Sequence, residues 1–175
     1  MGAAADAPLS EATRRQFEHP AEQLLRYMLF VKEAPLGDSD KEHIGTNSAF
    51  AREFGARGPR DTQGRSLRDL DLATKIFRYP CTYLIYSDSF DALPEPAKGY
   101  VYRRLLEVLS GKDQSPDFAR LTTADRSAIL EILLATKQGL PQEWRDYARA
   151  NHLHVAQESA PSSRQAANVL KTSTQ

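Results

Sequence analysis

The sequence holds a single cysteine, no long hydrophobic run and no excess of charge, and each shortage excludes a class of protein. Cys81 on its own cannot form an intramolecular disulfide or a cysteine-based zinc or iron–sulfur site. No stretch reaches the roughly 18–20 apolar residues that span a bilayer, so we expect no membrane insertion. Lysine plus arginine total 23, as do aspartate plus glutamate, and a net charge of zero does not favour a nucleic-acid partner.

Catalytic and targeting signatures are also missing. The sequence contains no G-x-S-x-G, H-E-x-x-H, Walker A or dinucleotide-binding motif, so we predict no catalytic residues and no cofactor. His152 and His154 form only an H-x-H pair, which is too weak to predict a metal site. Residues 1–10 lack the basic and apolar regions of a secretory signal. We expect a cytoplasmic protein, or a periplasmic one if the chain is a fragment of an exported protein.

The apolar spacing predicts an all-α fold, a single irregular bundle of about five to six helices over residues 20–151. We expect a flexible N-terminal lead over residues 1–19 and a disordered C-terminal tail over residues 152–175, because both ends are small and polar. The alternative to helix over Cys81–Tyr86 is a strand. The segments with helical signals are Pro20 to about Pro35, Ser48–Phe54, Ser66–Tyr79, Cys81–Tyr86, Pro94–Ser110, Thr122–Gly139 and Gln142–Ala150.

Two of these segments carry the clearest signals. Apolar residues recur at helical spacing around Leu105 in the segment Pro94–Ser110. Thr122 or Thr123 is a suitable N-cap for the next helix, whose buried stripe includes Ile132. Leu105 and Ile132 are therefore predicted core residues.

The segment Leu36–Arg65 is long and rich in glycine, and only its part around Ser48–Phe54 has a helical pattern. Phe50 and Phe54 are four residues apart, which places them on one helical face. A mobile connection would not keep two phenylalanines. We therefore predict an ordered glycine-rich loop that lies over the helices, with both rings buried.

A charged segment follows, in which arginines alternate with aspartates. Free backbone N–H groups at a helix that begins at Ser66 would favour an anionic ligand, so Arg60, Arg65 and Arg68 are candidates for an anion site. The alternative, which we favour, is an ion-pair network that holds the loop on the domain. Its carboxylates would come from Asp61, Asp69 and Asp71.

Tyr79, Tyr83 and Tyr86 are spaced by four and three residues, so that one continuous helix would place them on one face. Tyrosines offer an apolar ring with a polar tip, which suits contact with a ligand or a partner. Aromatic stripes at helical spacing more often pack at the edge of a core. We therefore retain these tyrosines as candidates beside the packing interpretation.

Several segments between Leu25 and Trp144 carry a resemblance to a known group of proteins. The segments are Leu25-Arg26-Tyr27-Met28-Leu29-Phe30, Glu33-Ala34-Pro35-Leu36, Gly58-Pro59-Arg60-Asp61, Gly64-Arg65-Ser66-Leu67-Arg68-Asp69-Leu70-Asp71-Leu72, Phe77-Arg78-Tyr79-Pro80-Cys81, Tyr83-Leu84-Ile85-Tyr86-Ser87 and Phe90-Asp91-Ala92-Leu93-Pro94. They resemble the C-terminal region of a group of larger, uncharacterised bacterial proteins, some of which are exported. The group has no known activity, so the resemblance implies only that this chain is part of, or derived from, such a protein.

Two functional hypotheses follow. The first is a non-enzymatic accessory or protein-interaction module, whose partner is another protein or the flanking domains of a larger chain. The second is a small-ligand-binding or enzymatic domain, with its site between the region Tyr79–Tyr102 and the loop Arg57–Arg68. An exposed apolar patch would favour the first hypothesis, and a concave tyrosine-lined pocket with convergent charges would favour the second.

Overall fold

The structure, a computed structural model, describes residues 11–34, 36 and 48–153, and within these ranges the fold is all-α without a sheet. Two single turns of 3-10 helix, η1 and η2, accompany the α-helices. The elements are α1 (Glu11–Met28), α2 (Ala49–Ala56), η1 (Tyr83–Tyr86), α3 (Asp88–Asp91), α4 (Glu95–Leu109), η2 (Pro116–Phe118), α5 (Thr123–Thr136) and α6 (Gln142–Ala150).

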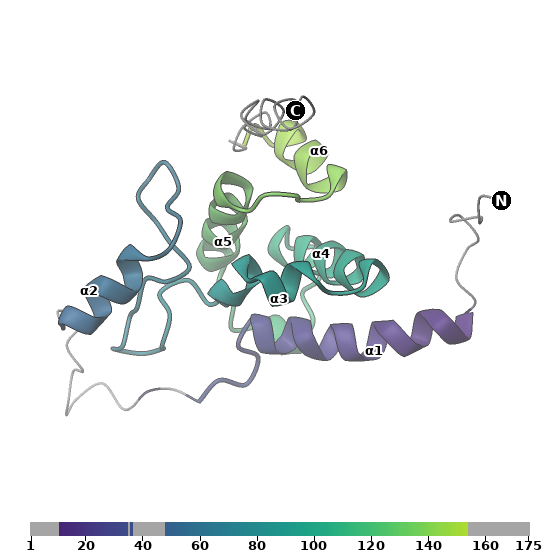
Figure 1. The fold of residues 1–175 in the computed structure, drawn as a ribbon, viewed down its shortest axis with the longest axis horizontal. Coiled ribbons are helices and arrows are strands. Elements are labelled where there is room, and N and C mark those ends of the chain that lie inside the picture. Colours follow the sequence, from purple (N-terminus) through teal and green to yellow (C-terminus); the bar gives the residue numbers. More distant parts are fainter. Residues whose placement is uncertain (1–10, 35, 37–47, 154–175) are drawn as a thin grey trace, which may run out of the picture.

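Helix α4 lies at the centre of the bundle. It packs on α1 along one side and on α5 along the other, and α6 packs in turn on α5. Figure 1 shows α1 running beneath α3 and α4, with α5 and α6 above them and α2 at one edge of the molecule. No helix in the described ranges is both long and apolar enough to cross a membrane.

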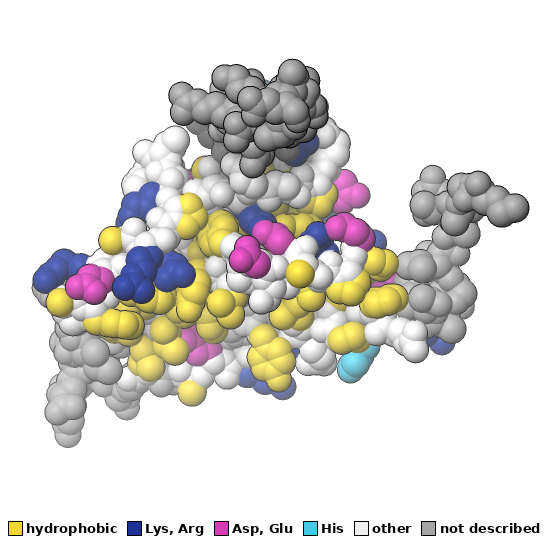
Figure 2. All heavy atoms as spheres, in the orientation of Figure 1, with side chains coloured by type: hydrophobic (Ala, Val, Ile, Leu, Met, Phe, Trp, Pro, Cys, Tyr) yellow, Lys and Arg dark blue, Asp and Glu magenta, His cyan; other side chains and the backbone are white. Residues whose placement is uncertain are grey.

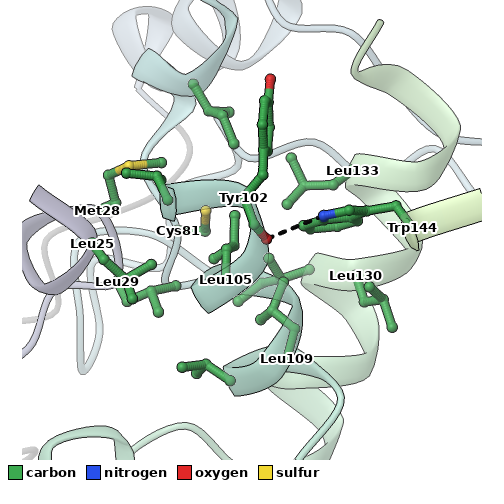
Figure 3. Close-up of a cluster of buried hydrophobic side chains, with 14 of the residues drawn as sticks. Leu25, Met28, Leu29, Cys81, Tyr102, Leu105, Leu109, Leu130, Leu133 and Trp144 are labelled. Carbon is green, nitrogen blue, oxygen red and sulfur yellow. Dashed lines mark hydrogen bonds between the residues drawn. The ribbon is translucent and has the colours of Figure 1, made fainter. Parts of the chain in front are cut away.

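The core forms where α1, α4, α5 and α6 meet (Figure 3). Leu105 and Ile132 are fully buried there, as predicted. Trp144 is enclosed too, and its indole N–H donates to the carbonyl of Tyr102 at 3.1 Å, so that its one polar atom is satisfied. Cys81 packs among these apolar side chains as a small hydrophobe.

The local helix signals around α4 and α5 are confirmed. Helix α4 spans Glu95–Leu109, and Gly111 follows with a φ of 78°. Thr122 caps α5 through its side chain, which accepts from the backbone N–H of Asp125 at 3.0 Å. The Asp125 side chain accepts in turn from the backbone N–H of Thr122, which completes a capping box.

Helix α1 differs from the prediction at both ends. It begins at Glu11, so Glu11–His19, predicted as part of a flexible lead, are helical. Pro20 then lies inside the helix instead of at its first position, where it forgoes one backbone hydrogen bond. The helix ends at Met28, well before Pro35, because Phe30 adopts a left-handed conformation with a φ of 52°.

The end of α1 is a Schellman motif. The backbone N–H of Val31 donates to the carbonyl of Arg26 at 2.9 Å, and that of Phe30 donates to the carbonyl of Tyr27 at 3.2 Å. Glycine usually occupies the left-handed position of this motif, because a side chain there costs roughly 1–2 kcal/mol. Here that position holds Phe30, so the end of α1 carries backbone strain and places an aromatic ring beside Phe77.

The predicted helix over Ser66–Tyr79 is wrong. The chain instead folds back on itself, with an isolated antiparallel bridge between Leu70 and Phe77. The backbone N–H of Arg78 donates to the carbonyl of Asp69 at 2.8 Å, and Leu72 turns the chain with a φ of 59°. The Ser66 side chain accepts from the backbone N–H of Arg68, a local turn that competes with helix.

Two further expectations concern the loop and the tail. Phe50 is 69% exposed, so the prediction that it is buried is wrong, while Phe54 is half-buried. The described part of the predicted loop is ordered as α2, with Ser48 as its N-cap, followed by a tight turn. Residues 37–47, residues 1–10 and the predicted tail beyond Leu153 lie outside the described residues.

Candidate functional site

The arginine loop is held together by internal ion pairs. Arg65 Nε lies 2.6 Å from Asp61 Oδ2, and Arg65 Nη2 lies 2.6 Å from Glu131 Oε2 on α5. Asp61 Oδ1 also accepts from the backbone N–H groups of Gln63 and Arg65, at 2.9 and 2.8 Å. Burial by itself raises the pKa of Asp61, but the hydrogen bonds and the charge of Arg65 outweigh it, so its pKa is lowered.

Arg60 completes this network on the other side of the turn. It lies 3.0 Å from Asp69 Oδ1 and donates to the carbonyl of Gly55 in the last turn of α2. A cation at the C-terminal end of a helix is favoured by the helix dipole. Arg60 and Arg65 therefore pair with carboxylates, as the network interpretation predicted, and they hold α2 and its loop against α5.

The three candidate tyrosines do not share a face, because Pro80 and a turn separate them. The Tyr86 hydroxyl lies 2.7 Å from Thr136 Oγ1, and burial raises the pKa of Tyr86. Tyr79 lies beside the guanidinium of Arg78, 5.9 Å from ring centroid to Cζ. Only Tyr83 meets one of the candidate arginines.

That arginine is Arg68, which lies over two adjacent rings. Its Cζ is 4.1 Å from the ring centroid of Tyr83 and 4.8 Å from that of Phe54. A cation over an aromatic face is attracted by the ring quadrupole. Among the described residues no carboxylate forms an ion pair with Arg68.

Glycine is required beside Arg68. A Cβ atom at Gly58 would lie 2.5 Å from Ser66 Oγ and 3.0 Å from the Cδ atom of Arg68. Any larger residue would push the arginine stem or the buried serine out of place. Gly58 therefore allows the close approach that places Arg68 on the rings.

Arg68 covers part of a cluster of five aromatic rings that we call the aromatic patch: Phe30, Phe50, Phe54, Phe77 and Tyr83. It contains four of the seven phenylalanines of the chain. Phe30 stacks on Phe77 with centroids 5.3 Å apart, and Phe54 meets Tyr83 edge to face at 5.3 Å. All five rings are at least partly exposed, so the patch lies outside the buried core.

An apolar groove of about 330 Å³ adjoins the aromatic patch and lies between α1 and the segment η1–α3. Tyr83 belongs to the patch and its neighbour in the chain, Leu84, lines the groove, so consecutive residues of η1 contribute to the two surfaces. Tyr27 is 77% exposed and Leu84 is 55% exposed at its rim. The groove is lined by Leu24, Tyr27, Met28, Thr82, Leu84, Ile85, Ser87, Ser89, Phe90 and Leu93.

The space-filling view shows how these surfaces combine. Hydrophobic side chains gather between α2 and α1, and Lys and Arg side chains lie beside them on the α2 side (Figure 2). Monomeric proteins rarely expose contiguous apolar patches larger than a few hundred Å², and larger ones often mark binding sites. An exposed apolar patch is the feature that favours an interaction module over a ligand-binding domain, and this face carries exposed hydrophobic side chains.

Other ionisable groups of the described chain are engaged in packing. Arg104 binds Glu22, Glu107 and Asp113, with the shortest N···O distances at 2.6 Å, and ties α1 to the loop after α4. Burial raises the pKa of the Cys81 thiol to about 12, so the thiol stays protonated at neutral pH. No three His, Cys, Asp or Glu side chains of residues 11–34, 36 and 48–153 converge as metal ligands would.

Sequence reasoning found only part of this site. It named Arg68 and Tyr83 as candidates and noted the spacing of Phe50 and Phe54, but it did not connect them. Phe30 and Phe77 reach the patch only through the strained end of α1 and the fold-back at Leu70. No local sequence signal reports either feature.

We compared the chain with protein-family models, with curated proteins and with solved structures, and found no significant match in any of the three. The function must therefore be argued from the geometry of the aromatic patch, the groove and Arg68.

Proposed function

We propose that this protein is a non-enzymatic interaction module that docks a partner protein on the aromatic patch and the adjoining groove. The observation that carries the proposal is the exposure of large apolar side chains at one joined surface, with Tyr27, Phe50 and Leu84 each more than half exposed. Covering apolar surface stabilises a complex by roughly 25 cal/mol per Å². Aromatic side chains are also the residues most enriched at the centres of protein interfaces.

Backbone strain at Phe30 supports the same surface. A residue held in a sparsely populated backbone region persists only when the surrounding structure maintains it, and such residues cluster at functional sites. The strained Phe30 carries its ring onto Phe77, on the edge of the aromatic patch, instead of into the core. Glycine would serve the helix end better, so the aromatic ring has a use of its own there.

The alternative, an anion site on the arginine loop, has less support. Arg60 and Arg65 already bind Asp69, Asp61 and Glu131, so an incoming anion would have to displace a carboxylate from each of them. The resemblance to the C-terminal region of larger bacterial proteins supports a module within a longer chain. The partner would then be another protein or a flanking domain.

Site-specific photo-crosslinking tests this proposal. Phe50 is replaced by benzoylphenylalanine in the cells that make the protein, and Gln138, exposed in the turn between α5 and α6, receives the same group as a control. We expect a discrete covalent adduct with one protein from position 50 and none from position 138. The proposal fails if position 50 gives no discrete adduct, or if both positions give the same adducts.

A further inference from the structure

We propose that the segment docked on this surface is acidic as well as apolar, with a partner carboxylate that binds Arg68. This inference rests on the proposed function and deepens it by naming the chemistry of the partner. It draws on three features. These are the charge around the aromatic patch, the lack of an ion pair between Arg68 and any described carboxylate, and the geometry of the exposed rings.

The charge around the patch is positive although the chain as a whole is neutral. Seven basic and four acidic residues lie between Ala49 and Arg78, which leaves a formal charge of +3 on the segment that carries most of the patch. Asp61 and Asp69, two of its four carboxylates, are already bound to Arg65 and Arg60. Glu131 and Asp125 of α5 pair with Arg65 and Lys75, which reduces the charge of this segment with its partners to +1. The attraction for a negatively charged partner therefore depends above all on Arg68, which forms no ion pair with a described carboxylate.

Arg68 supplies the specific contact. Its guanidinium lies over Tyr83 and Phe54, so one side of the cation has lost water to the rings, and none of the described carboxylates forms an ion pair with it. A planar guanidinium presents N–H donors that match the two oxygens of a carboxylate. The rings and Gly58 hold the arginine in place before a partner arrives, which lowers the entropy lost on binding.

The apolar groove supplies the rest of the contact. Thr82 and Leu84, the chain neighbours of Tyr83, line the groove, and Tyr83 lies beneath Arg68, so a segment in the groove has one route to the guanidinium across η1. Aliphatic or aromatic anchors of the partner would fill the space between Tyr27 and Leu84. A carboxylate beside those anchors would then reach the guanidinium.

Single-stranded nucleic acid fits the same surface less well. Bases bind proteins by stacking on free ring faces. Phe30 and Phe77 stack on each other, Phe50 and Phe54 do the same, and Arg68 covers the face of Tyr83. The groove near these rings is lined by apolar and hydroxyl side chains and by no lysine or arginine. The arrangement is therefore that of a protein-binding surface.

The first test is selection of random 16-residue peptides, displayed on phage, against the full chain. We expect the selected peptides to combine apolar anchors with aspartate or glutamate. Their synthetic versions should lose affinity for Phe50→Ser and Leu84→Ser variants of the chain. Melting curves of these variants verify that the chain is still folded.

The second test is charge reversal at Arg68. We expect Arg68→Glu to weaken a selected acidic peptide by about tenfold or more and to improve a peptide in which lysine replaces its acidic residues. Arg103, which lies 5.2 Å over the ring of Tyr100 on α4, provides the matched control, and Arg103→Glu should change neither affinity. Arg68→Gln, a milder change, should remove the preference without reversing it.

The possible outcomes separate this inference from the proposed function. Peptides that bind the patch without a preference for acidic residues overturn the inference and leave the proposed function standing. Peptides that ignore Phe50→Ser, or a library that yields no binder, overturn both. If a fluorescent oligothymidine binds to the patch, the inference is overturned and the occupant is a nucleic acid. If sedimentation shows dimers that Phe50→Ser dissociates, the inference is overturned and the occupant is a second copy of the chain.

Discussion

Replacing Arg65 by alanine tests how the arginine loop is held. Removing one partner of a buried ion pair costs about 3–5 kcal/mol, and a hydrogen bond to a charged group contributes about 1.5–3 kcal/mol. The Asp61 side chain is 2% exposed, but Arg65 is 18% exposed and Asp61 keeps two backbone hydrogen bonds. The bond to the more exposed Glu131 adds about 0–1 kcal/mol. We therefore expect Arg65→Ala to lower the free energy of unfolding by about 2–3 kcal/mol.

Urea unfolding followed by circular dichroism at pH 7 measures this loss. Arg149→Ala is the matched control, since Arg149 belongs to an exposed pair with Asp146, and it should change the unfolding free energy little. A loss below about 0.5 kcal/mol for Arg65→Ala would refute the reasoning. If phosphate then raised the melting temperature of the parent but not of the variant, an anion site would replace the ion-pair account.

The same pair predicts a pH dependence. The folded pKa of Asp61 is lowered, so its contribution is present above its unfolded pKa, roughly 3.9, and is lost as pH falls through the folded value. Arg65→Ala removes the side-chain hydrogen bond and the positive charge that help to lower this pKa but keeps the two backbone hydrogen bonds, so the pKa of Asp61 should rise toward its ordinary value. The stability gap between parent and variant should thus be full at pH 7 and should narrow below about pH 4. A gap of equal size at pH 7 and pH 3 would contradict this mechanism.

Three further predictions concern packing and backbone conformation. Gly58→Ala should destabilise the protein by about 1–3 kcal/mol in thermal melts, because the new Cβ atom would clash with buried Ser66. Gly99→Ala, in an open helical position, should instead stabilise the protein by about 0.5–1 kcal/mol. Equal effects of the two substitutions would show that the crowding at Gly58 is relieved without cost. Leu105→Ala should cost about 2–5 kcal/mol in urea unfolding, and a loss below about 0.5 kcal/mol would place it outside the core. His152→Gly should raise the unfolding free energy by about 0.5–1 kcal/mol, since His152 ends α6 with a φ of 56°, and a decrease would contradict strain at that position.

The sequence predicted those elements that depend on local chemistry. The capping of α5 by Thr122 and the end of α4 before Gly111 follow from side chains within one turn of the helix terminus. The amphipathic spacing around Leu105 likewise fixed which face is buried. These features need no knowledge of distant contacts.

The features that the sequence did not predict depend on contacts between distant segments. The fold-back at Leu70–Phe77 replaced a helix because the bridge, the turn at Leu72 and the ring contacts of Phe77 outweigh helix propensity. Phe50 was predicted to be buried with Phe54 because a mobile connection would not keep two phenylalanines. The structure instead leaves Phe50 69% exposed, with its ring stacked on Phe54.

The candidate site was predictable in its ionic part and not in its aromatic part. Alternating arginines and aspartates indicated a network, and Arg60 and Arg65 form one. Arg68 is in the same sequence segment and differs only in its surroundings, which come from α2 and η1. Its different surroundings are visible only once Phe54 and Tyr83 are placed beside each other beneath its guanidinium.

Hydrogen–deuterium exchange of the full chain, with and without a selected peptide at saturation, tests the central claim most directly. If the aromatic patch and groove form the docking surface, exchange should slow in α2 and in η1, while α6, on the other side of the bundle, exchanges as before. Slower exchange confined to α6, or no change in α2 and η1 when the peptide is bound, would contradict the account.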